Sequence, residues 1–128
     1  MTDDTSCHRF RFAWLLPLLL LAALPSTARA DYRAGAIAFE KGEFAMALKY
    51  WRPLAEAGDA KGQFGLGVLY DEGRGLAEDR RQAAFWFAKA AEQGHASAQH
   101  NLAQLHLAGD GMPPDPSLAR RWLERAAA

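Results

Sequence analysis

Apolar residues recur at helical spacing through most of the chain that follows residue 58. Between Asp59 and Asp71 the apolar side chains fall three or four positions apart, as on one face of an α-helix. A second apolar segment runs from Ala83 to Gln93, and Gly94 follows it as a stop signal. The pattern therefore predicts two helices joined by a short turn.

This pair of helices is repeated with a period of 36 residues. The segments Ala55–Ala90 and Ala91–Ala126 align without a gap, and small, turn and aromatic positions recur in one register. Repeats of this length are typical of stacked helical hairpins, which bury their apolar faces against neighbouring copies. The repeated structural positions are Ala60, Leu66, Gly67, Leu69, Gly73, Gly75, Asp79, Ala83, Trp86 and Gly94 in one copy, and Leu102, Leu105, Gly109, Gly111, Asp115, Ala119 and Trp122 in the next.

The glycine-dense stretch GQFGLGVLYDEGRG, residues 62–75, raises the question of a phosphate-binding loop. Gly73 and Gly75 recur as Gly109 and Gly111, whereas a nucleotide loop would be made once. No Lys-Ser or Lys-Thr pair follows, and no strand is expected before the stretch. We therefore interpret these glycines as a turn that ends the first helix of each hairpin.

Two further glycines, Gly65 and Gly67, fall inside the first predicted helix. Each lowers helix propensity by about 1 kcal/mol relative to alanine. We expect the compensation to be close approach of a neighbouring helix backbone, and the equivalent Ala103 favours this interpretation for Gly67. A weak or kinked helix is the alternative.

Aspartates mark the starts of the second helices. Asp79 is an N-cap candidate, with Gln82 three residues later as a capping-box partner. In the next copy Asp115 takes the same place and Pro116 occupies the first helical position, where proline is tolerated. We interpret both aspartates as caps rather than as metal ligands or catalytic groups.

The second helix of the middle hairpin is apolar on several sides, with Phe85, Trp86 and Phe87 in succession. Such a helix is expected to be buried between neighbours. An aromatic ligand site is the alternative, and a packed core is favoured over it.

The ends of the array differ from its middle. Upstream, residues 31–57 form a shorter copy in which Gly42 takes the turn position, and Pro53 is expected to bend or interrupt its second helix. Downstream, the last helix carries Arg120, Arg121 and Glu124 where the preceding copy is apolar or small. One polar side suits a capping helix. We expect three hairpins, over residues 31–57, 58–93 and 94–128.

The first thirty residues have the order of a secretory signal. Arg9 and Arg11 precede the apolar run Trp14–Pro25, and STARA ends at Ala30 with the small-x-small form of a cleavage site. A membrane anchor is the alternative, but a spanning helix needs about 20 apolar residues. We expect cleavage between Ala30 and Asp31, a periplasmic or secreted location, and no membrane span in the processed chain.

Composition after residue 30 excludes several classes of function. The chain there has 12 Lys or Arg against 13 Asp or Glu, because Arg9, Arg11 and Arg29 precede it, so the net charge is near −1. The sequence has no stripe of basic residues of the kind that would indicate nucleic-acid binding. The single cysteine, Cys7, lies in the predicted signal, so the processed chain can form no disulfide.

Candidate chemistry in the processed chain is sparse. Ser97 lies three residues before His100, but no carboxylate is placed to orient the histidine and no oxyanion hole is evident. His95, His100 and His106 are five and six residues apart, which is not the spacing that puts two ligands on one helix face. We expect no catalytic residue, no metal and no cofactor.

The repeat resembles the Sel-one-like repeat (SLR) family, a relative of the tetratricopeptide repeat. The resemblance rests on the pattern Ala-x5-Leu-Gly-x-Leu-Tyr, Gly-x-Gly, Asp and Ala-x2-Trp-x3-Ala-Ala-Glu-x-Gly, met from Ala60 to Gly94. The next copy departs from it at Ala103 and His106. The resemblance implies an all-α solenoid of antiparallel hairpins in a right-handed superhelix that binds proteins or peptides. Some cysteine-rich members are linked with β-lactam binding or hydrolysis, but this chain lacks those cysteines.

We therefore predict a non-catalytic adaptor that holds a peptide or helix of another exported or envelope protein. The groove is expected along the first helices of the hairpins, and the chain is expected to be a monomer. A cell-wall or β-lactam hydrolase and a structural subunit of an envelope assembly are the alternatives. The candidate partner-binding residues are Gln63, Tyr70, Gln99, His100, Gln104 and His106.

Overall fold

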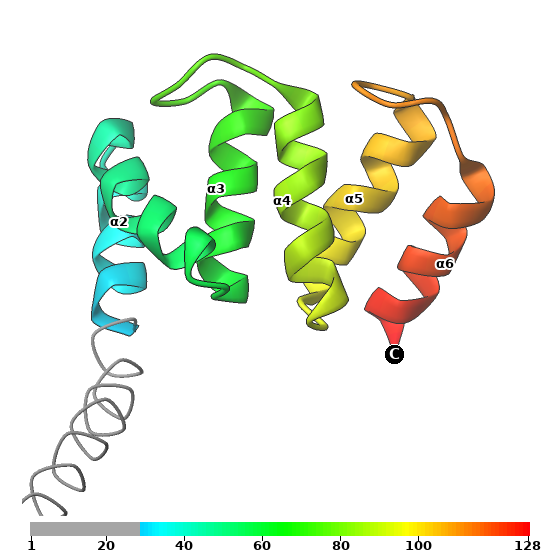
Figure 1. Ribbon diagram of the computed structural model, residues 1–128, viewed down its shortest axis with the longest axis horizontal. Coiled ribbons are helices and arrows are strands. Elements are labelled where there is room, and N and C mark those ends of the chain that lie inside the picture. The colour runs from blue at the N-terminus through cyan, green and yellow to red at the C-terminus, as the bar shows by residue number, and fades with distance from the viewer. Residues whose placement is uncertain (1–28) are drawn as a thin grey trace, which may run out of the picture. The chain divides into compact units, whose positions relative to one another are not determined.

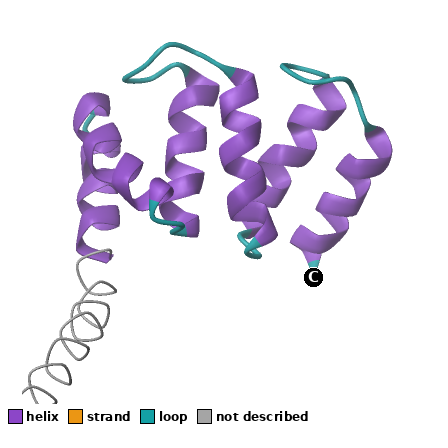
Figure 2. Ribbon diagram, viewed as in Figure 1, coloured by secondary structure: helices purple, strands orange, loops and turns teal. Residues whose placement is uncertain are grey.

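The computed structural model describes residues 29–128, and every regular element in that part of the chain is a helix. Residues 29–40 are helical and precede five further helices. These are α2 (Phe44–Glu56), α3 (Ala60–Glu72), α4 (Arg80–Glu92), α5 (Ala96–Ala108) and α6 (Pro116–Ala127). No strand occurs within the described range (Figure 2). The predicted signal falls almost wholly outside that range.

Successive helices pack against one another as hairpins. Helix α2 contacts α3, α3 contacts α4, α4 contacts α5 and α5 contacts α6. In Figure 1 the helices from α3 to α6 stand side by side in chain order, joined alternately at opposite ends. The hairpins are residues 29–40 with α2, α3 with α4, and α5 with α6. The prediction of an all-α solenoid of helical hairpins is confirmed.

The helix starts are capped by side chains at the repeated positions. The Asp79 carboxylate accepts hydrogen bonds from the backbone N–H groups of Arg81 and Gln82, at 3.0 and 3.1 Å. The Asp115 carboxylate accepts from the N–H of Leu118 at 3.0 Å. Each cap satisfies backbone donors that have no partner inside their helix.

The first helices of the two full repeats also share a cap position, filled by different residues. Asp59 accepts from the N–H of Gly62 at 2.8 Å. Thirty-six residues later, the unprotonated Nδ1 of His95 accepts from the N–H of Ala98 at 3.2 Å. Histidine in this place makes the start of α5 sensitive to protonation, because an Nδ1 that carries a proton cannot accept.

The glycines of the interhelical turns have the backbone geometry expected of them. Gly73 and Gly109 end α3 and α5 in the left-handed conformation, with φ of 64° and 68°. Their N–H groups donate to the carbonyls of Leu69 and Leu105. Only glycine adopts this conformation without steric cost. The interpretation of the glycine-dense stretch as a turn agrees with this geometry.

The second glycine of each turn lies in close contact with the backbone of the preceding hairpin. A Cβ on Gly75 would lie 2.9 Å from the carbonyl oxygen of Phe44, at the start of α2. A Cβ on Gly111 would lie 2.8 Å from the backbone nitrogen of Arg81, near the start of α4. The two contacts are related by the repeat, so each long turn rests on the preceding second helix.

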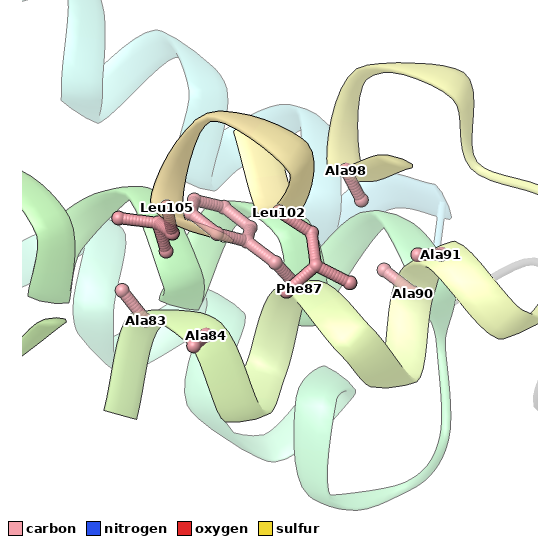
Figure 3. Packing of buried hydrophobic residues seen from close by; sticks show 8 residues of the cluster. All are labelled: Ala83, Ala84, Phe87, Ala90, Ala91, Ala98, Leu102 and Leu105. Carbon is pink, nitrogen blue, oxygen red and sulfur yellow. The ribbon is translucent and has the colours of Figure 1, made fainter. Parts of the chain in front are cut away.

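The core between the middle and last hairpins is a phenylalanine ring surrounded by small residues and leucines (Figure 3). Phe87 is fully buried on α4 and points toward Leu102 and Leu105 of α5. Alanines let the two helices approach closely around it. The buried alanines of this cluster are Ala83, Ala84, Ala90, Ala91 and Ala98.

The glycines inside α3 make room for rings rather than for a helix backbone, so that expectation was wrong. A Cβ on Gly67 would lie 2.6 Å from two carbons of the Phe87 ring. A Cβ on Gly65 would lie 2.6 Å from the Trp51 indole. Backbone approach occurs instead at Gly62, where a Cβ would lie 3.0 Å from the nitrogen of Ala55. Helix α3 continues through all three glycines.

Pro53 was expected to bend or interrupt α2, and the interruption does not occur. The helix runs from Phe44 to Glu56 with Pro53 inside it. Pro53 lies in the last turn of α2. The missing N–H of proline therefore costs only one helical hydrogen bond, close to the C-terminal end of the helix. The Pro53 carbonyl still accepts from the N–H of Ala57.

The second helices of the two full repeats each carry a tryptophan at the position that recurs after 36 residues. Trp86 on α4 and Trp122 on α6 are both partly buried. Helix α6 buries only Ala119 fully and exposes Arg120, Arg121 and Glu124, as a one-sided helix does.

The His95 cap predicts a loss of stability in mild acid. Burial, and then the nearby Lys61 cation, lower the pKa of His95 below its ordinary value, although a hydrogen bond with its own backbone and the Asp59 carboxylate act to raise it. The folded chain therefore prefers neutral His95, while the unfolded chain takes up the proton near pH 6.5. The cap is fully effective above that pH and is progressively lost as the pH falls below it.

We expect wild type to lose about 1 kcal/mol of unfolding free energy relative to His95→Asn between pH 7.5 and 5.5. Asparagine caps the helix equally well but does not titrate. The measurement is urea unfolding followed by circular dichroism at several pH values. Parallel pH profiles for the two proteins would show that His95 does not act as a titrating cap.

Candidate functional site

Two hollows lie along the first helices of the hairpins. The first has a volume of about 200 Å³ between residues 29–40, α2 and α3. Its apolar and aromatic lining consists of Tyr32, Ala36, Phe39, Trp51, Phe64 and Val68, and Glu40 is its only charged residue. The second has a volume of about 630 Å³ and is lined by parts of α3, α5 and α6. Both hollows include Phe64, which makes them neighbours on one surface.

The ring of Phe64 is held by its contacts on both sides. Its centroid lies 5.8 Å from that of the buried Phe87. It stacks on the imidazole of His95 with 4.7 Å between centroids. Phe64 itself is only partly buried. A fixed, partly exposed aromatic ring therefore separates the two hollows.

The first hollow is built on Trp51. The indole is buried, and a Cβ on either Gly35 or Gly65 would overlap it, so both helices close on the ring. Its Nε1–H donates to the carbonyl of Tyr32 at 3.1 Å. The rings of Tyr32 and Phe39 lie 6.0 and 5.7 Å from it. These contacts fix the walls before any ligand arrives.

Electrostatics keep Tyr32 neutral at the edge of this hollow. Burial, followed by the nearby Asp59 carboxylate, raises the pKa of the Tyr32 phenol. The ammonium of Lys61 lies 5.6 Å from the centre of its ring. The phenol therefore acts as an aromatic surface and a neutral hydrogen-bonding group, not as an acid or base near neutral pH.

The second hollow contains Ser97 and His100 but no carboxylate that could complete a hydrolytic triad. Both residues are exposed on α5. No aspartate or glutamate is among the residues that line this hollow. A histidine without an orienting carboxylate is poorly placed to activate a serine.

Of the six candidate partner-binding residues, only His100 lines either of these hollows. Gln104 is exposed on α5 and lines neither of the two. Tyr70 is partly buried and packs against the core. His106 lines a third hollow, between α4 and α6, and its Nδ1 is buried without a hydrogen-bond partner in the described part of the chain.

Gln63 and Gln99 are interior residues, so placing them on a binding surface was wrong. They are 4% and 3% exposed. Each donates from Nε2 to a carbonyl at the end of the preceding second helix, Ala55 for Gln63 and Ala91 for Gln99. Their recurrence after 36 residues was the available signal, because a glutamine kept in register with core positions is expected to serve the fold.

Gln93 extends this polar contact in the middle of the array. Its Nε2 donates to the Gln63 side-chain oxygen at 2.8 Å and to the carbonyl of Gly58 at 3.0 Å. The three groups join the end of α4 to the turn before α3. Buried polar groups are stable only when they are paired in this way.

Sequence reasoning missed most of the first hollow. Tyr32, Phe39 and Trp51 come from the shorter first copy, whose pattern is the least regular. Phe64 is one of the apolar residues between Asp59 and Asp71, whose spacing predicts a helix but not a binding surface. Aromatic density in residues 32–51 was the one signal that pointed there.

The described residues show neither a metal centre nor a membrane-spanning element. No group of three His, Cys, Asp or Glu side chains in residues 29–128 is arranged to hold a metal ion. No helix in that range has both the length and the apolar character needed to cross a bilayer.

Comparison with protein families and solved structures gave consistent results. The family model described as Sel1 repeat matches residues 28–59, 60–95 and 96–128. A Sel1 repeat protein from Oxalobacter formigenes is similar in structure, with a TM-score of 0.71 and 29% identity over 76% of this chain and 39% of its own.

A second solved structure is a protective antigen present in uropathogenic Escherichia coli strains, which displays an SLR fold. Its TM-score is 0.74, with 31% identity over 88% of this chain and 25% of its own. The present chain thus spans less than half the length of either solved structure. A search of the curated proteins gave no match.

The buried glutamines predict unequal effects of the same substitution. Gln63→Ala removes the donor to the Ala55 carbonyl and the acceptor for Gln93, so we expect it to lower the unfolding free energy by about 1–3 kcal/mol. Gln104→Ala, at an exposed position, should change it by less than about 0.5 kcal/mol. Thermal and urea unfolding measure both. Equal, small effects would argue against a structural role for Gln63.

Proposed function

Because the chain belongs to the Sel1 repeat family, whose members are generally protein-interaction modules, we propose that it is a non-catalytic adaptor of the bacterial cell envelope. It binds a peptide or helix of another exported protein along the first helices of its hairpins. The segment lies over Phe64 and reaches into the hollow on each side. The observation that carries the proposal is that both hollows share this ring.

The lining of the surface supports this kind of ligand. Ligand sites are commonly apolar with a few polar groups that fix orientation. The first hollow offers aromatic and aliphatic walls with Glu40 at its edge. The second offers Leu123 together with the polar groups of Ser97, His100 and Asn101. Together they suit a segment with an apolar side chain on one side of Phe64 and a more polar one on the other.

Rigidity supports the same proposal. The Trp51 and Phe64 rings are already fixed by Gly65, Phe87 and His95 in the absence of a ligand. A surface that is already ordered loses less conformational entropy on binding. The adaptor would therefore bind with little rearrangement of its own backbone.

An envelope location is supported by the leader. Basic residues, an apolar run and a small-x-small end precede Asp31 in the order of a secretory signal. The absence of cysteine after Cys7 means that folding outside the cytoplasm would need no disulfide chemistry. We propose that the processed chain acts as a monomer in the periplasm or outside the cell.

The adaptor proposal predicts that one side chain can block capture of the partner. Ser97 and Ser117 are both exposed second residues of their helices, but of the two only Ser97 lines a hollow beside Phe64. The Ser97→Trp side chain should fill the second hollow and reduce capture of a specific envelope protein at least about tenfold. Ser117→Trp should leave capture unchanged.

The measurement is quantitative mass spectrometry of proteins retained from envelope extracts by wild type and both variants. Circular dichroism verifies that all three are folded. Retention of the same proteins in equal amounts by all three would contradict the proposed surface. A partner that stays bound through extended washing at constant stoichiometry would favour a structural subunit over an adaptor.

A further inference from the structure

The second helices carry an apolar hollow that the proposed function does not use. This third hollow has a volume of about 470 Å³ and is bounded by α4, α5 with the turn that follows it, and α6. It shares no residue with the two hollows around Phe64. The apolar side chains that matter to its shape are Phe85, Met112, Leu118 and Trp122.

Phe85 is the residue of this hollow that packing does not explain. It was expected to be buried between neighbouring helices, and this was wrong, since the side chain is 51% exposed. The equivalent positions in the other hairpins hold Lys49 and Arg121, both exposed. The fold therefore accepts a charged residue there. The Phe85 ring is steadied by an edge contact with Trp86, 5.1 Å between centroids.

Three cations line the third hollow or lie over its aromatic rings, and none has an ion-pair partner within residues 29–128. Arg81 lines the hollow. The Lys89 ammonium lies 5.0 Å from the Phe85 ring centre, and the Arg125 guanidinium lies 4.9 Å from that of Trp122. None of these three cations takes part in a salt bridge, whereas the adjacent Arg80 pairs with three carboxylates.

Only one acidic side chain, Glu92, lines this hollow. Three cations without salt bridges, beside the exposed Phe85 ring and the partly buried Trp122 ring, form a surface complementary to carboxylates that accompany apolar side chains. Potentials of opposite sign steer and orient a partner, while buried apolar anchors supply most of the affinity.

We propose that the third hollow is a second docking surface, which binds an acidic amphipathic helix of a partner protein. Apolar side chains at positions i, i+3 or i+4 of that helix lie against Phe85, Met112 and Trp122. Its flanking Glu or Asp side chains pair with Arg81, Lys89 and Arg125. The proposal does not depend on the surface around Phe64, and with both in use the chain would bridge two proteins.

A helix fits this surface better than an anionic membrane does. A membrane-bound face inserts protruding apolar side chains into a plane. Here the apolar residues surround a hollow. A helix in a groove needs a concave apolar floor with charged margins, which is the arrangement seen.

The test uses the protein purified after export, together with three designed tryptophan-free peptides of 15 residues. The first peptide is an amphipathic helix with leucines on one face and glutamates beside them. The second has lysine in place of every glutamate, and the third has the first composition in scrambled order. Binding is followed by nuclear magnetic resonance through the Trp122 indole N–H, assigned with Trp122→Phe.

We expect saturable binding of the acidic amphipathic peptide only, with a Kd that rises as salt is added. Phe85→Ala and Arg81→Glu should each raise the Kd at least about tenfold, equivalent to about 1.4 kcal/mol. The matched controls are Ile37→Ala, another half-exposed apolar residue, and Lys49→Glu, an exposed charge on α2. Both should leave the Kd within about twofold.

Several results would overturn the proposal. These are binding of the basic or scrambled peptide as tight as that of the acidic one, or equal effects of Phe85→Ala and Ile37→Ala. Phe85-dependent binding to anionic phospholipid vesicles without peptide binding would assign the surface to lipid instead. A Phe85-dependent dimer in sedimentation would assign it to a second copy.

Discussion

The fold depends on how closely the first helix of a hairpin can approach the large side chain of the second. Phe87 meets Gly67 of its own hairpin, and no Cβ could be added there without displacing the ring. At the equivalent positions of the next hairpin, 36 residues on, alanine (Ala103) replaces glycine and leucine (Leu123) replaces phenylalanine. The side chain on the first helix is larger and the one on the second helix is smaller, so the summed side-chain volume of the two positions stays similar, as close packing requires.

This constraint determines which surfaces remain for binding. The first helices turn their small residues toward the rings behind them, so larger side chains such as Phe64 are left facing outward between the hairpins. The second helices are not restricted in that way on their outer side, where Lys49, Phe85 and Arg121 occupy equivalent places. Specificity can therefore vary at these positions without disturbing the stack, which is a general property of repeat proteins.

The architecture was predictable from the sequence because turn, cap and small residues recur in one register. Asp79, Asp115, Gly73 and Gly109 have the local roles assigned to them. The proposed binding surface was not predictable, because it joins non-repeating side chains from three helices, as at Tyr32 and Phe64 in the first hollow.

Polarity alone was also a poor guide to exposure. The glutamines Gln63 and Gln99 are buried because backbone carbonyls at the end of the preceding helix need donors, and Phe85 is exposed although it is apolar.

The most direct test of the account is the coupling between Gly67 and Phe87 in unfolding free energy. Gly67→Ala should destabilise wild type by about 1–3 kcal/mol yet be neutral or favourable with Phe87→Leu, which recreates the pair found at Ala103 and Leu123. An identical effect of Gly67→Ala in both backgrounds would contradict it.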